Sequence, residues 1–242
     1  MKIGNILGVD IKLNWTLIIL VIILMSKFGD YAQVVIPDAS RFATLAISLL
    51  ASLGLLLSIL LHEFGHILVG RHYGINFKEV MLHIFGGAAV MDSNIPSAKA
   101  EFFMALAGPV VSFLLSLGCF ILAIPFAIFD FKPALFVFSI LGNINAALFI
   151  FNLFIVAFPL DGSRVLRAAI WWWKKDYVKA TVIASKIGKV IGAAMVCCGV
   201  LMAMGVYIPM FGVGISNGIW ISIMGLFINM AATMELKRVR PV

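Results

Sequence analysis

The sequence predicts an all-α membrane protein of six transmembrane helices, with a short β-hairpin or re-entrant loop between the second and third. Hydrophobic residues make up 63% of the chain and charged residues only 12%, which is about half the charge of a soluble domain. Most of the apolar segments reach the ~20 residues that cross a bilayer as a helix. A Gly-Gly pair interrupts the longest polar connection, which favours a turn there.

Charged and turn-forming residues separate the apolar segments and mark the expected end of each span. The first segment is the shortest, and the last two are rich in Gly and Met, as in a scaffold or a gate. No soluble domain is visible, so we expect one membrane domain over residues 1–242. The six expected spans are Leu13–Met25, Phe42–Gly70, Phe102–Phe129, Ala134–Phe158, Val182–Ile208 and Val213–Met234.

The basic residues indicate how these spans are oriented. With the N-terminus inside, 15 of the 18 Lys and Arg residues fall on the inner side, and only Lys27, Arg41 and Lys132 fall on the other. This positive-inside bias is typical of an inner or plasma membrane, and it places both termini in the cytoplasm. The net charge of +7 therefore reflects membrane topology and no nucleic-acid partner is expected. The basic run after Asp161 is expected to face anionic lipid headgroups of the bilayer.

The connection from Arg71 to Glu101 is half apolar and contains the predicted hairpin. Gly86 and Gly87 lie in its middle and break any helix there, which favours two short strands or a re-entrant turn. Two interpretations fit equally well. The segment is either an edge strand that pairs with an extended substrate, or a loop on the membrane surface.

Two histidines and a glutamate near the end of the second span form a metal-site pattern, His62-Glu63-Phe64-Gly65-His66. Residues four apart share a helical face, so His62 and His66 can hold one metal ion. In H-E-x-x-H proteases the glutamate takes a proton from the attacking water, and Glu63 has that place. Because polar groups at membrane depth are costly, this pattern favours a functional site over histidines packed in a core.

A zinc site with two histidines on one helix requires a third protein ligand, and Asp161 is the predicted one. Pro159 should end the fourth span, and Gly162 permits a tight turn after it. This local break would aim the Asp161 carboxylate inward instead of continuing the helix.

Other assignments for these polar residues remain open. Asp161 could instead be a helix-end carboxylate paired with Arg164 or Arg167, in which case Glu101 or Asp92 would be the next ligand candidates.

The fourth span carries three asparagines, Asn143, Asn145 and Asn152. They could join helices through hydrogen bonds, and Asn152 is equally suited to hold a substrate carbonyl near Asp161. His72 and His83 are expected to be interfacial residues.

The motifs resemble those of the site-2 protease family of intramembrane zinc metalloproteases, in its archaeal and bacterial branch with a six-span core. The resemblance covers nearly the whole chain in the right order. It rests on Leu61-His62-Glu63-Phe64-Gly65-His66, Gly86-Gly87, Ala107-Gly108-Pro109, Phe151-Asn152-Leu153 and Pro159-Leu160-Asp161-Gly162.

The resemblance implies one zinc ion on His62, His66 and Asp161, with Glu63 as the catalytic acid and base. It implies cleavage of a peptide bond in or near the transmembrane segment of a membrane-anchored protein, such as a transcription regulator or an anti-sigma factor.

The chain departs from the family pattern in two places. The stretch between Asn152 and Asp161 lacks a second proline and is one residue longer, and Ser163 stands where many relatives have Gly. The first difference bears on Asn152 more than on Asp161. We expect no PDZ or CBS domain within this chain.

Two other classes of function use the same residues. A metal transporter could bind zinc in transit, although such proteins usually contain internal repeats or several midplane polar residues, and the sequence shows no repeat. A catalytically silent membrane scaffold is the third possibility. The sequence leaves the oligomeric state, the substrate and the cleavage position open.

Overall fold

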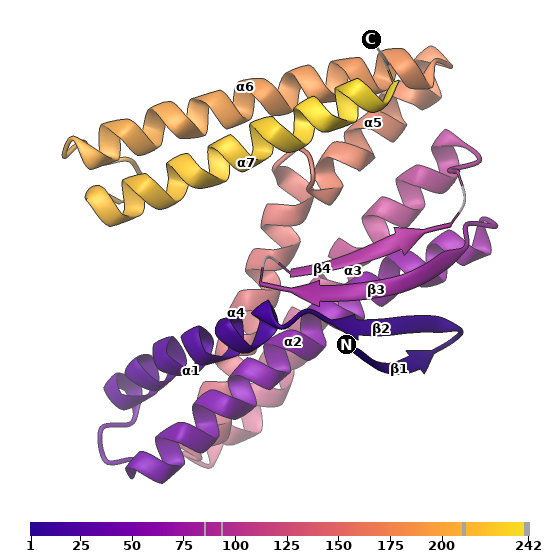
Figure 1. Ribbon diagram of the computed structural model, residues 1–242. Helices are drawn as coiled ribbons and strands as arrows, with labels where there is room; N and C mark the ends of the chain where they lie inside the picture. Colours follow the sequence, from indigo (N-terminus) through magenta and orange to yellow (C-terminus); the bar gives the residue numbers. More distant parts are fainter. Residues whose placement is uncertain (85, 93, 210–211, 240–242) are drawn as a thin grey trace. The chain divides into compact units, whose positions relative to one another are not determined.

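The computed structural model describes residues 1–84, 86–92, 94–209 and 212–239 (Figure 1). The chain divides into two compact units. Unit 1 comprises residues 1–96 and 107–150, and unit 2 comprises residues 97–106 and 151–242. Helices α3 (Ala98–Ile128) and α4 (Lys132–Phe154) contribute residues to both units.

Six helices of the described residues are long and apolar enough to cross a membrane, which confirms the six-span prediction. Their boundaries differ from the predicted ones mainly at the first span, which begins at Thr16 and continues to Val35. Lys27 and Asp30 lie within this helix and are exposed, so polarity there did not end it. The six are α1 (Thr16–Val35), α2 (Arg41–His72), α3, α4, α6 (Tyr177–Ala203) and α7 (Ile215–Val239).

Unit 1 contains a four-stranded sheet of β1 (Lys2–Ile6), β2 (Val9–Leu13), β3 (Phe77–His83) and β4 (Gly86–Met91), in that order (Figure 1). The β3–β4 hairpin confirms the predicted one, and β4 is the outer strand on its side of the sheet. The N-terminal hairpin was not predicted. Its turn at Leu7 and Gly8 has φ of 51° and 76°, as a two-residue hairpin turn requires.

One face of the sheet is packed inside unit 1. Val9, Ile11, Val80 and Leu82 alternate along β2 and β3 and are all buried, which is the two-residue period of a strand with one covered face. Register follows from this pattern, because a shift of one residue would expose every one of these side chains. The parallel pairing of β2 with β3 thereby ties the start of the chain to the hairpin that follows α2.

Small and polar residues bring the helices of unit 1 together. A Cβ added at Gly54 of α2 would lie 2.7 Å from Leu141 of α4, so glycine permits this close packing. One turn further along α2, the Asn145 amide of α4 donates a hydrogen bond of 2.9 Å to Ser58 Oγ. The prediction that an asparagine of the fourth span joins helices is therefore confirmed for Asn145.

Unit 2 contains the α6–α7 pair and α5 (Asp161–Lys174), a 14-residue helix (Figure 1). Glycines line the contact between α6 and α7, where a Cβ at Gly225 would lie 2.6 Å from Gly192 O. From the sequence, the residues after Asp161 were expected only to form a basic run at the lipid headgroups. They form a helix whose buried residues include Gly162, Arg167 and Ala168, and Trp173 and Lys174 at its C-terminal end are exposed.

Candidate metal centre

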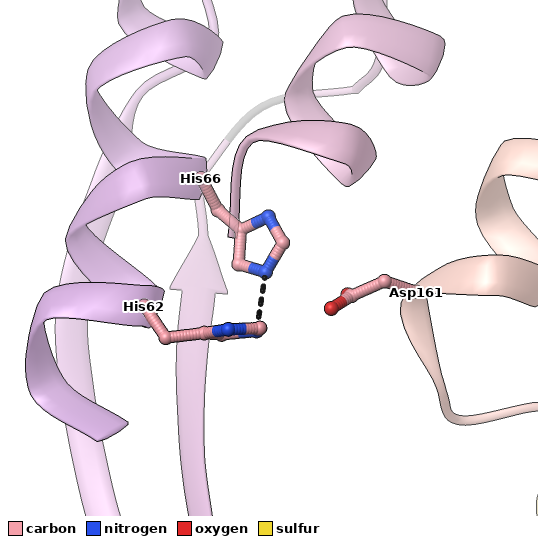
Figure 2. A group of neighbouring side chains, drawn as sticks. All are labelled: His62, His66 and Asp161. Atoms are coloured by element: carbon pink, nitrogen blue, oxygen red, sulfur yellow. Dashed lines mark hydrogen bonds between the residues drawn. The ribbon is translucent and has the colours of Figure 1, made fainter. Parts of the chain in front are cut away.

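His62 and His66 project from successive turns of α2, and their rings face each other edge to face (Figure 2). Their Nε2 atoms lie 3.2 Å apart. Two nitrogens that each lie ~2.05 Å from a tetrahedral zinc ion are separated by about 3.3 Å. The spacing therefore suits two ligands of one zinc ion.

A serine of α3 fixes the orientation of the first imidazole. Ser112 Oγ lies 2.8 Å from His62 Nδ1, and the two residues are 0% and 6% exposed, respectively. A metal ion on Nε2 requires the proton of a neutral imidazole to be on Nδ1, where Ser112 can accept it. Such outer contacts set the tautomer and the ring orientation of metal-binding histidines.

Two glycines leave room around the histidine pair. A Cβ at Gly65 of α2 would lie 2.9 Å from Ala107 O, so its absence lets the α3 backbone approach α2. A Cβ at Gly108 would lie 2.7 Å from His62 Nε2 and closer still to His66 Nε2. The space that a side chain would fill is therefore kept beside both nitrogen donors, and these donors fit a zinc ion.

Glu63 is half-buried, and it packs against the hairpin. A Cβ at Gly87 would lie 2.6 Å from Glu63 Cγ and 2.9 Å from Glu63 Oε1. Gly86, which precedes it, has φ of +118°, a conformation that only glycine adopts readily. The two glycines named in the sequence analysis thus have separate roles: Gly86 shapes the turn, and Gly87 lets β4 lie against the carboxylate.

Asp161 is the first residue of α5 and belongs to unit 2 (Figure 2). Leu160 before it is extended, and a Cβ at Gly162 would lie 2.9 Å from the Leu153 carbonyl carbon. A break is present as predicted, but α4 ends at Phe154, five residues before Pro159. Gly162 lies within α5 and serves close packing there instead of a tight turn. Because Asp161 and the histidines belong to different units, their assembly into one site stays a prediction.

Two of the remaining candidates, Glu101 and Asn152, lie in unit 2. Glu101, the alternative ligand, forms a buried ion pair with Arg167, which also contacts Glu235. Arg167 was one of the two arginines expected as possible partners of Asp161. In the structure it is oriented toward two other carboxylates, those of Glu101 and Glu235. Asn152 lies in the last turn of α4, and its role stays a prediction.

A protein-family model and several known proteins match this chain. The model of peptidase family M50 matches residues 50–129, which include the histidine pair, the hairpin and Ser112. A solved structure titled site-2 protease from Methanocaldococcus jannaschii superimposes with a TM-score of 0.58 at 28% identity, over 98% of this chain and 94% of that one. The chain is thus similar to peptidase family M50 over residues 50–129 and to a site-2 protease over nearly its whole length.

The curated relatives of this chain are longer than the matched region. The zinc metalloprotease MJ0392 of M. jannaschii is 34% identical over 83% of this chain and 54% of its own length. The protein named Rip3 in Mycobacterium tuberculosis is 32% identical over 98% of this chain and 58% of its own length. The chain thus spans little more than half the length of these relatives.

These matches confirm the resemblance drawn from the sequence motifs, and the relatives named as zinc metalloproteases agree with zinc as the cofactor. The six helices and the small sheet agree with the site-2 protease fold. Ser112 was not among the partners expected for His62 from the sequence. A signal was available, because Ser112 lies one helical turn after Gly108 and would share its face of the third span.

Replacement of Ser112 by Ala should weaken zinc binding by about 10- to 100-fold, the usual cost of losing an outer contact to a metal-binding histidine. Competition with a chromogenic chelator measures this affinity in detergent. Ser116→Ala is the matched control, because Ser116 is also buried on α3 but donates to Gly142 O. Equal zinc affinity in the two variants would contradict the role given to Ser112.

Proposed function

We propose that this chain is an intramembrane zinc metalloprotease that hydrolyses a peptide bond in or near the transmembrane segment of a membrane-anchored protein. The observation that carries the proposal is the histidine pair, with Nε2 atoms 3.2 Å apart, on an apolar helix next to Glu63. A zinc donor set and a half-buried carboxylate on one helix are the parts that peptide hydrolysis by this class of enzyme requires.

The proposed ligands are His62, His66 and Asp161, which offer two imidazole nitrogens and one carboxylate oxygen. Two His and one carboxylate leave a fourth position for water or substrate, as in catalytic zinc sites of other proteases. Three facts support Asp161. It begins a helix after an extended residue, it belongs to the Pro-Leu-Asp-Gly motif, and its rival Glu101 binds Arg167 in unit 2.

In the proposed reaction, Glu63 moves the protons. Held by His62, His66 and Asp161, zinc would lower the pKa of a water molecule and polarise the scissile carbonyl. Glu63 would take one proton from this water while the water oxygen attacks the carbonyl carbon. When the carbon–nitrogen bond breaks, Glu63 delivers that proton to the leaving amine. His62 keeps its orientation throughout, because Ser112 holds Nδ1.

We further propose that β4 presents the substrate to Glu63. A transmembrane helix hides its peptide bonds, so the segment to be cut must first become extended. An extended segment that paired with the outer edge of β4 would lie ~4.8 Å from that strand. Since Gly87 brings β4 against Glu63, the added strand would run beside the catalytic carboxylate.

The setting of the reaction is also part of the proposal. The substrates would be membrane-anchored transcription regulators or anti-sigma factors. The protease would lie in the inner or plasma membrane of the cell, with both of its termini in the cytoplasm. The excess of basic residues on the inner side of the predicted spans supports this orientation. The catalytic parts would all belong to one membrane domain over residues 1–242.

Replacement of Glu63 by Gln should lower cleavage of a single-span substrate by at least about 100-fold, because it removes the proton acceptor. Zinc content should be unchanged, since both imidazoles remain. The measurement is the initial cleavage rate in detergent, with and without a chelator. Residual activity within tenfold of the wild type would count against Glu63, and zinc flux into liposomes without any cleavage would indicate a transporter.

Replacement of Asp161 by Ala should lower both zinc affinity and activity, because it removes the proposed third ligand. Zinc bound per chain after dialysis against a chelator series is the measurement. Asp176→Ala is a suitable control, because Asp176 caps α6 by accepting from Lys179 N and has no proposed role in catalysis. Full zinc occupancy and activity in the Asp161 variant would require another ligand.

Replacement of Gly87 by Ala should impair cleavage while zinc stays bound, because the new Cβ would displace Glu63. If the variant disturbs strand pairing, its loss of activity should be smaller for a substrate with a helix-breaking residue near the cleavage site. If it disturbs Glu63 alone, the loss should be the same for both substrates. Ala88→Ser, at an exposed position of β4, is the control. A wild-type rate in the Gly87 variant would exclude close packing of β4 on the active carboxylate.

A further inference from the structure

A buried ion network in unit 2 joins three helices through one arginine. Arg167 of α5 donates from Nε to Glu101 Oε1 of α3 at 2.9 Å, and its Nη2 donates to the same oxygen. Its Nη1 lies 3.3 Å from Glu235 Oε2 of α7. Arg167 is 3% exposed and Glu101 is 0% exposed, so the central pair is removed from water.

Aromatic rings hold the same guanidinium from other directions. The Arg167 guanidinium carbon lies 5.1 Å from the ring centroid of Phe158 and 5.1 Å from that of Tyr177. Phe158 belongs to the segment that leads into α5, and Tyr177 is the first residue of α6. The arginine therefore contacts the segments on both sides of its own helix as well as α3 and α7.

This network is poorly explained by helix adhesion alone. Removing charges from water is costly, and well-packed apolar side chains of similar volume often hold helices together as well as a buried ion pair does. Two carboxylates share one guanidinium here, and among the described residues Glu101 Oε2 has no hydrogen-bond partner. Unlike apolar packing, the planar guanidinium group fixes the orientation of its partners, because its N–H groups donate hydrogen bonds only in defined directions.

The helix whose direction is fixed in this way begins at Asp161. Arg167 lies six residues after Asp161, or about 9 Å along the helix. The start of α5 is also packed tightly, since Gly162 has no room for a Cβ next to the end of α4. Rotation or sliding of α5 would therefore have to break the contacts of Arg167, and it would carry the Asp161 carboxylate with it.

We propose that Arg167 is a positioning residue of the zinc site: by binding Glu101 and Glu235 it fixes α5, and so holds the Asp161 carboxylate where it serves as a metal ligand. This inference rests on the proposed function, in which Asp161 is the third ligand. Arg167 itself touches neither metal nor substrate. Its expected signature is a change in metal coordination without a matching loss of folding.

The test compares metal binding in variants that keep unit 2 folded. The double variant Glu101→Leu/Arg167→Met replaces the central pair by apolar side chains of similar volume, and Arg167→Lys keeps the charge but loses the fork. Lys174→Met is the control, since Lys174 is an exposed cation on the same helix. Each is measured for thermal unfolding without metal, for zinc affinity, and for the visible absorption of bound Co²⁺, which reports ligand geometry.

The double variant should unfold within about 4 °C of the wild type, bind zinc about 10- to 100-fold more weakly and show an altered Co²⁺ spectrum. Arg167→Lys should lie between it and the wild type, and Lys174→Met should match the wild type. A folded double variant with wild-type affinity and spectrum would overturn the proposal. If the double variant does not fold, a wild-type spectrum and affinity in Arg167→Lys would overturn it equally.

Asp161→Asn separates this inference from the proposed function on which it rests. If this variant binds zinc and Co²⁺ as the wild type does, Asp161 is not a ligand and the proposed site is wrong. If Asp161→Asn alters the spectrum while the Arg167 variants do not, the ligand assignment stands and only the positioning role of Arg167 fails.

Discussion

The close approach of the α3 backbone to α2 is the constraint on which the histidine site depends. Gly65 lets Ala107 O come near the helix that carries both imidazoles, and Gly108 keeps open the space beside their Nε2 atoms. The same approach brings Ser112 within 2.8 Å of His62. A side chain at Gly65 would separate the helices, and one at Gly108 would fill the space beside the two Nε2 atoms, so both glycines are needed for this arrangement.

The small sheet places backbone hydrogen-bonding groups next to a helix that lies in apolar surroundings. Unpaired backbone groups are expensive away from water, so a strand near the membrane survives where it has a partner or lines a cavity. β3 meets this requirement by pairing on both sides. β4 pairs on one side only among the described strands, and the extended substrate of our proposal would complete it. In our proposal, the edge strand therefore binds substrate as well as completing the sheet.

Unit 2 shows a different way to place a polar group in an apolar chain. Its buried carboxylate, Glu101, is held by a single arginine that two aromatic rings also contact. Burial of these charges costs free energy, and the resulting contacts define the orientation of α5. The histidine centre instead relies on neutral donors and a serine hydroxyl, for which the cost of desolvation is smaller.

The sequence by itself determined the features that depend on neighbours along the chain. Six apolar runs predicted six helices, the i, i+4 spacing predicted that His62 and His66 share a face, and the glycine pair predicted the β3–β4 hairpin. Each of these depends on a helical period, a strand period or a turn. These patterns each span a short stretch of sequence, so they predict the local structure without reference to the tertiary fold.

Only the tertiary structure decided which distant residues meet. β2 pairs with β3 across more than sixty residues of sequence. Ser112 contacts His62 at a separation of 50 residues, and Arg167 pairs with Glu101 at a separation of 66 residues. Arg167 had equally plausible carboxylates nearby in the sequence, Asp161 among them. Pairings of this kind depend on how the helices pack and on which polar groups stay exposed to water. A local sequence pattern determines neither of these.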